Sequence, residues 1–160
     1  MKKHWNEVAA RAGRNDLPLL LFYNFHTLPL EDRPKAVARS WMMPEWPEGH
    51  LPPEVWVTFF RAVGYLVDEA CGDRGTLPEQ LTLYRGAIPS RRLGMSWTGD
   101  RDRAEWFAHR FDGIRGDSLG KVWTVTVPRS LVLARITERR EDEYVLDTTA
   151  FSKRSISPAN

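Results

Sequence analysis

Three short stretches of the chain carry side chains that could do chemistry together. Arg85 follows an alternating apolar stretch, Ser96 opens the triplet Ser-Trp-Thr, and Glu143 closes the acidic triplet Glu-Asp-Glu. An arginine offers a planar fork of donors that stays charged and suits a phosphate. Glu141 and Glu143 are two residues apart, so both project from one face if the stretch is a strand. These residue types would make a polar site, provided that the fold brings them together.

Strands are predicted next to each of these residues. Residues 81–84 and 122–127 alternate between apolar and polar side chains, as half-buried strands do. Two further short strands are expected at 130–134 and 143–147. Because the connections are short, we expect most of these strands to pair antiparallel.

A helix is predicted directly after the Ser-Trp-Thr triplet. Asp100 can cap it, and a buried stripe recurs at helical spacing in Ala104, Phe107, Ala108 and Phe111. A tight turn at 88–92 can join the strand that ends at Tyr84 to the triplet. The second half of the chain therefore reads as a small, mostly antiparallel α+β unit.

The first half of the chain shows a helical pattern instead. Residues 53–70 place apolar side chains three and four apart after two prolines, and shorter helices are expected at 5–12 and 33–42. The proline-rich stretch 43–53 predicts a loop, and the glycines and proline of 71–78 separate the two halves. We expect a single domain, 1–160, with a helical part at 1–75 and the α+β part at 76–160.

Composition sets broad bounds on the class of protein. The chain is 42% hydrophobic and 28% charged with a net charge of +2, which suits a globular protein and does not by itself indicate a nucleic-acid or membrane partner. The lone Cys71 falls near the end of the predicted helix, so we expect it to be packed. The four histidines show no ligand spacing, so no metal is expected. No stretch near the N-terminus is apolar for long enough to span a bilayer, and we expect a cytoplasmic protein.

The order of these elements resembles the arginine, serine, glutamate signature of the ADP-ribosyltransferases, toxin-like enzymes that split NAD at the nicotinamide–ribose bond. In that family a Tyr-Arg-Gly strand comes first, a Ser-x-Ser or Ser-x-Thr strand leading into a helix second, and a Glu-x-Glu strand third. All three are present here between about residues 79 and 148. The resemblance implies a helical N-terminal layer packed on a small, mostly antiparallel split β-sandwich.

The resemblance implies NAD as substrate and a role for each motif residue. Glu143 would sit beneath the ribose and oppose the positive charge that builds as the glycosidic bond breaks. Ser96 would bond to the glutamate and the ribose edge, and Arg85 would clamp a phosphate. Gly86 would let the main chain approach the nicotinamide amide. The remaining residues implied to contact NAD are Tyr84, Trp97, Thr98 and Phe107, of which Trp97 and Phe107 are candidates to stack on nicotinamide.

The acceptor of ADP-ribose is predicted less directly. In arginine-modifying relatives the position of Glu141 activates the acceptor, so the resemblance implies a transferase, with a protein arginine as one possible acceptor. The stretch 135–140 matches the place where the family recognises its acceptor. A protein acceptor is favoured over RNA or DNA.

Other functions stay open. Each motif taken alone could be a surface ion pair, an ordinary strand or a solvated acidic turn. Water as acceptor would make an NAD glycohydrolase. A chain that kept the fold without catalysis could bind protein or nucleic acid, and arginines near the predicted site would suit nucleic-acid phosphates. These arginines are Arg91, Arg92, Arg101, Arg103, Arg110 and Arg115.

Overall fold

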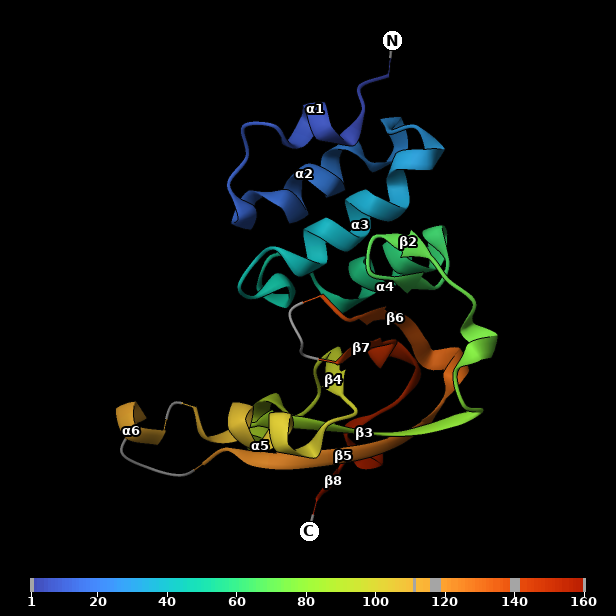
Figure 1. Ribbon diagram of the computed structural model, residues 1–160. Coiled ribbons are helices and arrows are strands. Elements are labelled where there is room, and N and C mark those ends of the chain that lie inside the picture. Colours follow the sequence, from blue (N-terminus) through green and yellow to red (C-terminus); the bar gives the residue numbers. More distant parts are fainter. Residues whose placement is uncertain (1, 111, 116–118, 139–141, 160) are drawn as a thin grey trace. The chain divides into compact units, whose positions relative to one another are not determined.

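The computed structural model describes residues 2–110, 112–115, 119–138 and 142–159. It contains helices and antiparallel strands, which confirms the α+β class (Figure 1). Two compact units are present, Met1–Asp73 and Arg74–Asn160. Within the described residues, no helix combines the length and the apolar character that crossing a membrane requires.

The first unit is mainly helical. Its helices are α1 (Trp5–Ala9), α2 (Leu17–Asn24), α3 (Arg33–Met42) and α4 (Pro53–Val63). An aromatic cluster forms its core, where the ring of Trp41 lies 5.2 Å from that of Trp56 in an edge-to-face contact. The ring centroid of Phe60 on α4 lies 5.7 Å from that of Trp41. Such aromatic pairs add stability beyond that expected from the apolar area that they bury.

Helix α4 ends earlier than its apolar pattern predicts. Gly64 follows it with φ 87° and ψ 179°, a backbone conformation that essentially only glycine adopts, and the helix ends there. The next residues instead form a short hairpin of β1 (Leu66–Val67) and β2 (Ala70–Cys71), with Asp68 at φ 52° in its turn. The prediction of a helix through Ala70 was therefore wrong. Cys71, expected to be packed, is exposed because it lies on this hairpin.

Helix α2 was not predicted. Its sequence, LPLLLFYN, is apolar nearly throughout, so it has no helical alternation of polar and apolar residues. Leu17 and Leu21 are buried in the first unit. Tyr23 on the same helix is 76% exposed.

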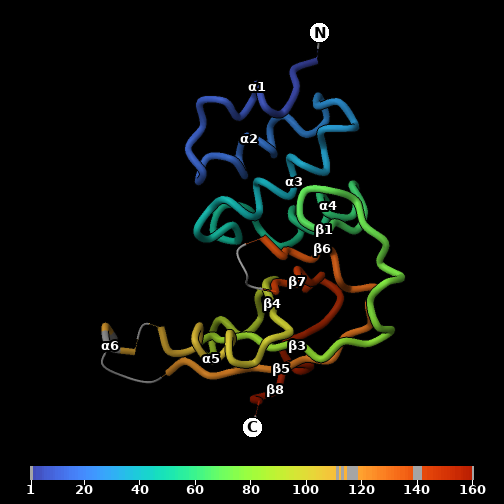
Figure 2. Tube along the Cα trace, viewed as in Figure 1, coloured from blue at the N-terminus to red at the C-terminus, as the bar shows by residue number. Residues whose placement is uncertain are grey.

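The second unit is built on an antiparallel sheet. Its strands lie in the order β6-β7-β4-β3-β5-β8, which does not close into a barrel (Figure 1). Figure 2 shows β3 and β5 running side by side along the unit, in register from Gln80–Pro128 to Ala87–Lys121. The strands are β3 (Gln80–Ala87), β4 (Ser96–Thr98), β5 (Lys121–Pro128), β6 (Val132–Ile136), β7 (Glu143–Leu146) and β8 (Ser157–Pro158).

The pairing between β3 and β4 covers fewer residues than the pairings on either side of it in the sheet. Tyr84 and Thr98 are the one register pair between these strands, whereas β4 pairs with β7 at three positions. The sheet therefore consists of two ladders, β5 with β3 and β4 with β7 and β6, that are joined at this pair. The three motif strands are neighbours in the sheet, in the order β7, β4 and β3.

Helix α5 (Arg101–His109) covers one face of β3 and β5. Asp100 caps it as predicted, since its carboxylate accepts from the main-chain nitrogens of Asp102 and Arg103. Ala104 and Ala108 are its buried residues, and they pack with Val122 of β5. Phe107 is only half-buried, and Phe111 lies outside the described residues. A short helix, α6 (Asp112–Arg115), follows.

Candidate functional site

One row of side chains crosses three neighbouring strands of the second unit. Tyr84 of β3 pairs with Thr98 of β4, and Thr98 pairs with Glu143 of β7. Residues directly opposite each other in an antiparallel sheet project from the same face. Tyr84 packs against the cluster of Ala104 and Ala108, so this face is the one that α5 covers in part. Glu143 therefore opens onto the same face of the sheet as α5.

Ser96 holds the carboxylate of Glu143. It lies two residues before Thr98 on β4, so it shares the face of Thr98. Its hydroxyl donates to Oε2 of Glu143 at 2.5 Å, and both side chains are half-buried. A hydrogen bond to a charged oxygen is short and strong, so it fixes the orientation of the carboxylate. The contact between serine and glutamate that the resemblance implied is present.

Arg85 is fixed by main-chain carbonyls. Nη1 donates to the carbonyl of Ser96 at 2.9 Å, and Nε and Nη2 donate to that of Arg91 at 3.3 and 3.2 Å. The guanidinium lies so close to Gly94 that a Cβ there would come within 2.2 Å of Nη2. Arg85 thus ties the turn after β3 to the start of β4. Its phosphate contact stays a prediction, and the observed bonds give it a role in holding Ser96 in place.

Gly86 has a packing role that the sequence did not predict. A Cβ at this position would lie 2.0 Å from the carbonyl oxygen of Ala104 and 2.4 Å from the nitrogen of Ala108. Because both atoms belong to the main chain of α5, the helix can approach β3 only if no side chain is present. The predicted approach of nicotinamide to the main chain of Gly86 is a separate possibility and stays a prediction.

Thr98 links β4 to the cap of α5. Its side chain is 6% exposed, and its hydroxyl accepts from the main-chain nitrogen of Asp100 at 3.0 Å. Asp100 in turn caps α5, so the short connection is held at both ends. Thr98 therefore supports the geometry of the strand, and its burial leaves little surface for a ligand.

The two aromatic residues expected to stack on nicotinamide differ in exposure. Trp97 is 2% exposed, and its indole N–H donates to the carbonyl of Gly94 at 2.7 Å. Burial rules out stacking of Trp97 on a ligand in this conformation, so this part of the prediction is replaced by a core role. Phe107 is half-buried and lies edge-to-face with Trp106 at 5.0 Å, with the guanidinium of Arg110 5.1 Å from its ring.

The residue before Glu143 has an unusual conformation. Asp142 has φ 43°, in the left-handed region, and β7 begins only at Glu143. Glu141, which strand alternation was expected to place on the face of Glu143, lies outside the described residues, as do residues 139 and 140 of the stretch 135–140. Arg135 of β6 pairs with Asp142 at 2.9 Å and lies 5.2 Å from the ring of Tyr144. This clamp on both neighbours of Glu143 was not predicted from the sequence.

Tyr144 gives the site region a dependence on pH. Burial raises the pKa of Tyr144 above its ordinary value of 10.0, the nearby Asp142 carboxylate adds to this, and Arg135 opposes it. Between the unfolded and folded pKa values the native state holds the proton that the unfolded chain has lost, so stability falls as pH rises. We expect the free energy of unfolding to decline above about pH 10, and Tyr144→Phe to make this decline shallower in urea unfolding measured across that range.

An exposed tyrosine provides the control. Tyr23 is 76% exposed, so Tyr23→Phe should leave the alkaline decline as in the wild type. If Tyr144→Phe and wild type lose stability along the same curve, the tyrosine does not carry the effect.

The first unit holds two features that the sequence did not indicate. His4, Glu31 and Asp32 bring ligand atoms within 4.8 Å of one another, a spacing that a metal ion could use. Asp32, however, already accepts from Trp5 N at 2.8 Å and lies 2.8 Å from His4 Nδ1, and the Trp5 N–H in particular lowers the pKa of Asp32. A hollow of about 560 Å³ is lined by Lys2, Lys3, Val8, Asn24, His26 and Thr27.

Comparison with known proteins adds no family to this description. No protein family, curated protein or solved structure in the comparisons matches the chain.

Proposed function

We propose that this chain is a mono-ADP-ribosyltransferase that cleaves NAD at the nicotinamide–ribose bond. The observation that carries the proposal is the 2.5 Å hydrogen bond from Ser96 Oγ to Glu143 Oε2 across neighbouring strands. It supports the resemblance because the motif order alone did not require these two side chains to touch. Arg85, the third motif residue, donates to the main-chain carbonyl of Ser96, although its side chain projects from the face of the sheet opposite to Glu143.

Glu143 is assigned the central role in this proposal. As the bond between the ribose C1′ and nicotinamide breaks, nicotinamide leaves with the electron pair and the ribose becomes an oxocarbenium-like cation. A carboxylate held beneath that ring stabilises the cation more than the bound substrate, which lowers the barrier. Ser96 keeps the carboxylate from rotating away, and Arg135 and Asp142 restrain the chain just before it.

The proposal also includes a specific type of fold. A split β-sandwich of the ADP-ribosyltransferase type would separate its two halves between the arginine strand and the serine strand. The single register pair between β3 and β4 supports such a division. Nicotinamide would then lie near the main chain of β3 beyond Tyr84, and Phe107 is the stacking candidate that remains.

The direct test uses the intact protein with NAD labelled in the adenylate half. We expect release of nicotinamide, with label transferred to a component of a whole-cell lysate. Label found only as free ADP-ribose would identify a glycohydrolase. Absence of nicotinamide release under every acceptor condition, together with no binding of NAD in calorimetry, would refute the proposal and leave a binding protein without catalysis.

Glu141 is expected to act on the acceptor rather than on NAD. Glu141→Gln should reduce transfer of labelled ADP-ribose while nicotinamide release in the absence of acceptor continues, since the substitution removes a proton acceptor and leaves Glu143 in place. The two rates are measured side by side on the same preparation. Equal loss of both rates would show that Glu141 serves the structure of the site and not the acceptor. Glu138→Gln, on the same stretch, is the control.

A further inference from the structure

Helix α5 has two flanks of different chemistry. One flank carries Glu105, His109 and Asp112, where His109 lies 3.1 Å from Glu105 and 2.8 Å from Asp112. The other flank carries Arg103, Trp106 and Arg110, which follow one another at steps of three and four residues and so lie along one side of the helix. Asp102, four residues before Trp106, and His109, three residues after it, lie beside Trp106 between the two flanks.

Trp106 is the unusual member of the second flank. Its side chain is 56% exposed, although a tryptophan usually buries most of its surface. It lies edge-to-face with Phe107 at 5.0 Å, and the guanidinium of Arg110 lies 5.1 Å from the Phe107 ring. These contacts hold Trp106 beside a second ring and a cation while its own surface remains open to solvent. This arrangement suits a flat, electron-rich group stacked between an aromatic ring and arginines.

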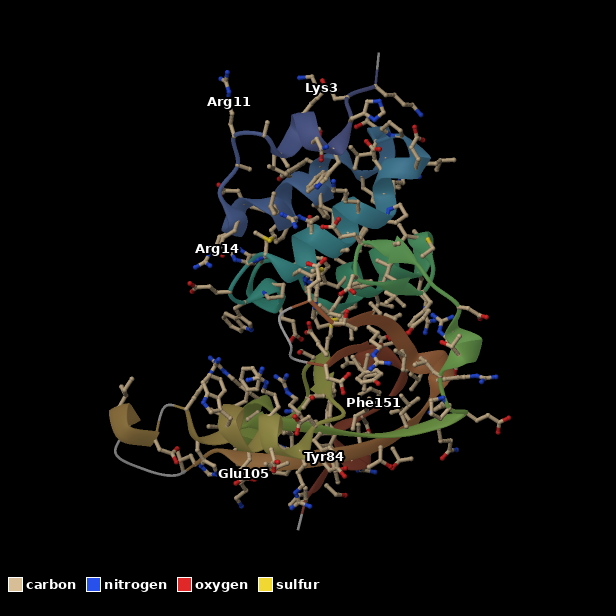
Figure 3. All side chains as sticks on the ribbon, in the orientation of Figure 1. Lys3, Arg11, Arg14, Tyr84, Glu105 and Phe151 are labelled. Carbon is tan, nitrogen blue, oxygen red and sulfur yellow. The ribbon has the colours of Figure 1, made fainter. Side chains whose placement is uncertain are left out.

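Arg103 and Arg110 lie on the side of α5 nearer the candidate site, and Trp106 projects away from the sheet because it is two residues from each of the buried Ala104 and Ala108. In Figure 3 the labelled Glu105 points away from β4, which places the acidic flank toward β5. The opposite flank is therefore the one toward β4, the strand that carries Ser96. As argued above, α5 and Glu143 share one face of the sheet.

The arginines that the sequence grouped together do not all share this surface. Arg92 packs on Trp123, which pairs with Arg85 and so faces away from the α5 side of the sheet. Arg101 lies 6.0 Å from the ring of Tyr84. Arg103 and Arg110 remain as the pair that flanks Trp106.

We propose that this flank, defined by Arg103, Trp106 and Arg110, binds a single-stranded nucleic acid and that this strand is the acceptor of ADP-ribose. Proteins that hold single strands combine arginines along the phosphates with aromatic rings on which bases stack. Arg103 and Arg110 attract a polyanion and repel a guanidinium acceptor on a protein, and Asp102 beside Arg103 reduces both effects. The charge of the second unit agrees, because residues 74–160 contain fifteen basic and eleven acidic residues.

The inference rests on the proposed function, and the transfer step balances as follows. The bond between C1′ of the ribose and nicotinamide breaks, and nicotinamide leaves with its electron pair. A nucleophilic nitrogen or oxygen of the strand forms the new bond to C1′ and loses a proton to a base, for which Glu141 is the candidate. No oxidant or further reactant is needed.

Binding is tested first, with fluorescein-labelled single-stranded oligonucleotides of mixed sequence and fluorescence anisotropy. Trp106→Ala should weaken binding by roughly 5-fold to 100-fold, the loss expected for one stacked base. Arg110→Gln should weaken binding most at low salt concentration. It should also reduce the slope of the logarithm of the binding constant against the logarithm of the salt concentration by about one. Glu105→Gln on the acidic flank is the matched control and should bind at least as well as the wild type. Thermal melting of each variant checks that the fold is kept.

Labelling is tested on the same samples with labelled NAD. We expect the wild type to label the oligonucleotide, Glu143→Gln to bind it without labelling, and Trp106→Ala to label it poorly at low oligonucleotide concentration. Two results together would overturn the nucleic-acid acceptor and leave the transferase intact. The first is nicotinamide release with label only in lysate protein, and the second is oligonucleotide binding that Trp106→Ala and Arg110→Gln do not change. No nicotinamide release with any acceptor would overturn both proposals.

Discussion

Glu143→Gln is expected to reduce nicotinamide release by on the order of 10²-fold to 10³-fold, or roughly 3 to 4 kcal/mol in the activation barrier. Glutamine has nearly the same shape, and its amide oxygen can still accept from the hydroxyl of Ser96, which lies 2.5 Å from Glu143 Oε2. The substitution removes only the negative charge that opposes the developing oxocarbenium. Nicotinamide release, NAD binding and thermal melting are measured together for the variant and the wild type.

The size of this effect separates catalysis from stability. A half-exposed Glu→Gln change away from a buried network usually alters stability by no more than about 0.5 kcal/mol. A variant that melts like the wild type and still binds NAD, yet turns over at least a hundred-fold more slowly, would identify Glu143 as the catalytic glutamate. Release at near the wild-type rate would remove Glu143 from that role. Glu105→Gln, on an exposed part of α5, is the control for the loss of one negative charge.

Local rules of the chain predicted the elements that hold the site. Asp100 was expected to cap a helix because a short carboxylate before an amphipathic run satisfies the first main-chain nitrogens, and it does. The alternation in β3 and β5 predicted both strands because one face is buried and the other half-exposed. Helix α3 was predicted at residues 33–42, the bounds that it has. Each of these rests on neighbouring residues alone.

The errors arose where an apolar pattern fits two structures. The run after Phe60 continues to place apolar residues at helical spacing, but Gly64 ends α4 and the same residues pack as the hairpin of β1 and β2. The sequence pattern does not predict helix α2, for the opposite reason: a uniformly apolar stretch shows no helical period. Neither result follows from local spacing, because a glycine's backbone conformation and the packing of neighbouring elements decide both.

Within the site, strand alternation also separates the three residues of the Ser-Trp-Thr triplet. On β4, Ser96 and Thr98 share one face, so Trp97 must project from the other, where it is buried. The same rule would have excluded Trp97 as a stacking residue beside Ser96. In contrast, the pairing of β4 with β7 and the clamp from Arg135 to Asp142 depend on strand order, which spacing along the chain does not contain.

Gly86→Ala is expected to lower the free energy of unfolding of the second unit by about 1 to 3 kcal/mol, the usual result of forcing an extra carbon into a packed region. Its Cβ would lie 2.0 Å from the carbonyl oxygen of Ala104, and that oxygen belongs to the backbone of α5 and cannot move by a change of rotamer. The helix must therefore shift away from β3. Urea unfolding of the intact chain measures the change.

Gly13→Ala provides the matched control. A Cβ at Gly13 would have its nearest contact 3.3 Å away, with the exposed side-chain carboxylate of Asp16, which accepts from the Gly13 N–H at 3.2 Å and has to shift only slightly. The change from glycine to alanine also restricts the unfolded chain, which favours folding by about 0.4 to 1 kcal/mol where the native conformation accepts it. Gly13→Ala should accordingly leave stability nearly unchanged, so that a loss seen only in Gly86→Ala reports the crowding against α5. If both variants unfold like the wild type, α5 does not lie as close to β3 as these contacts require.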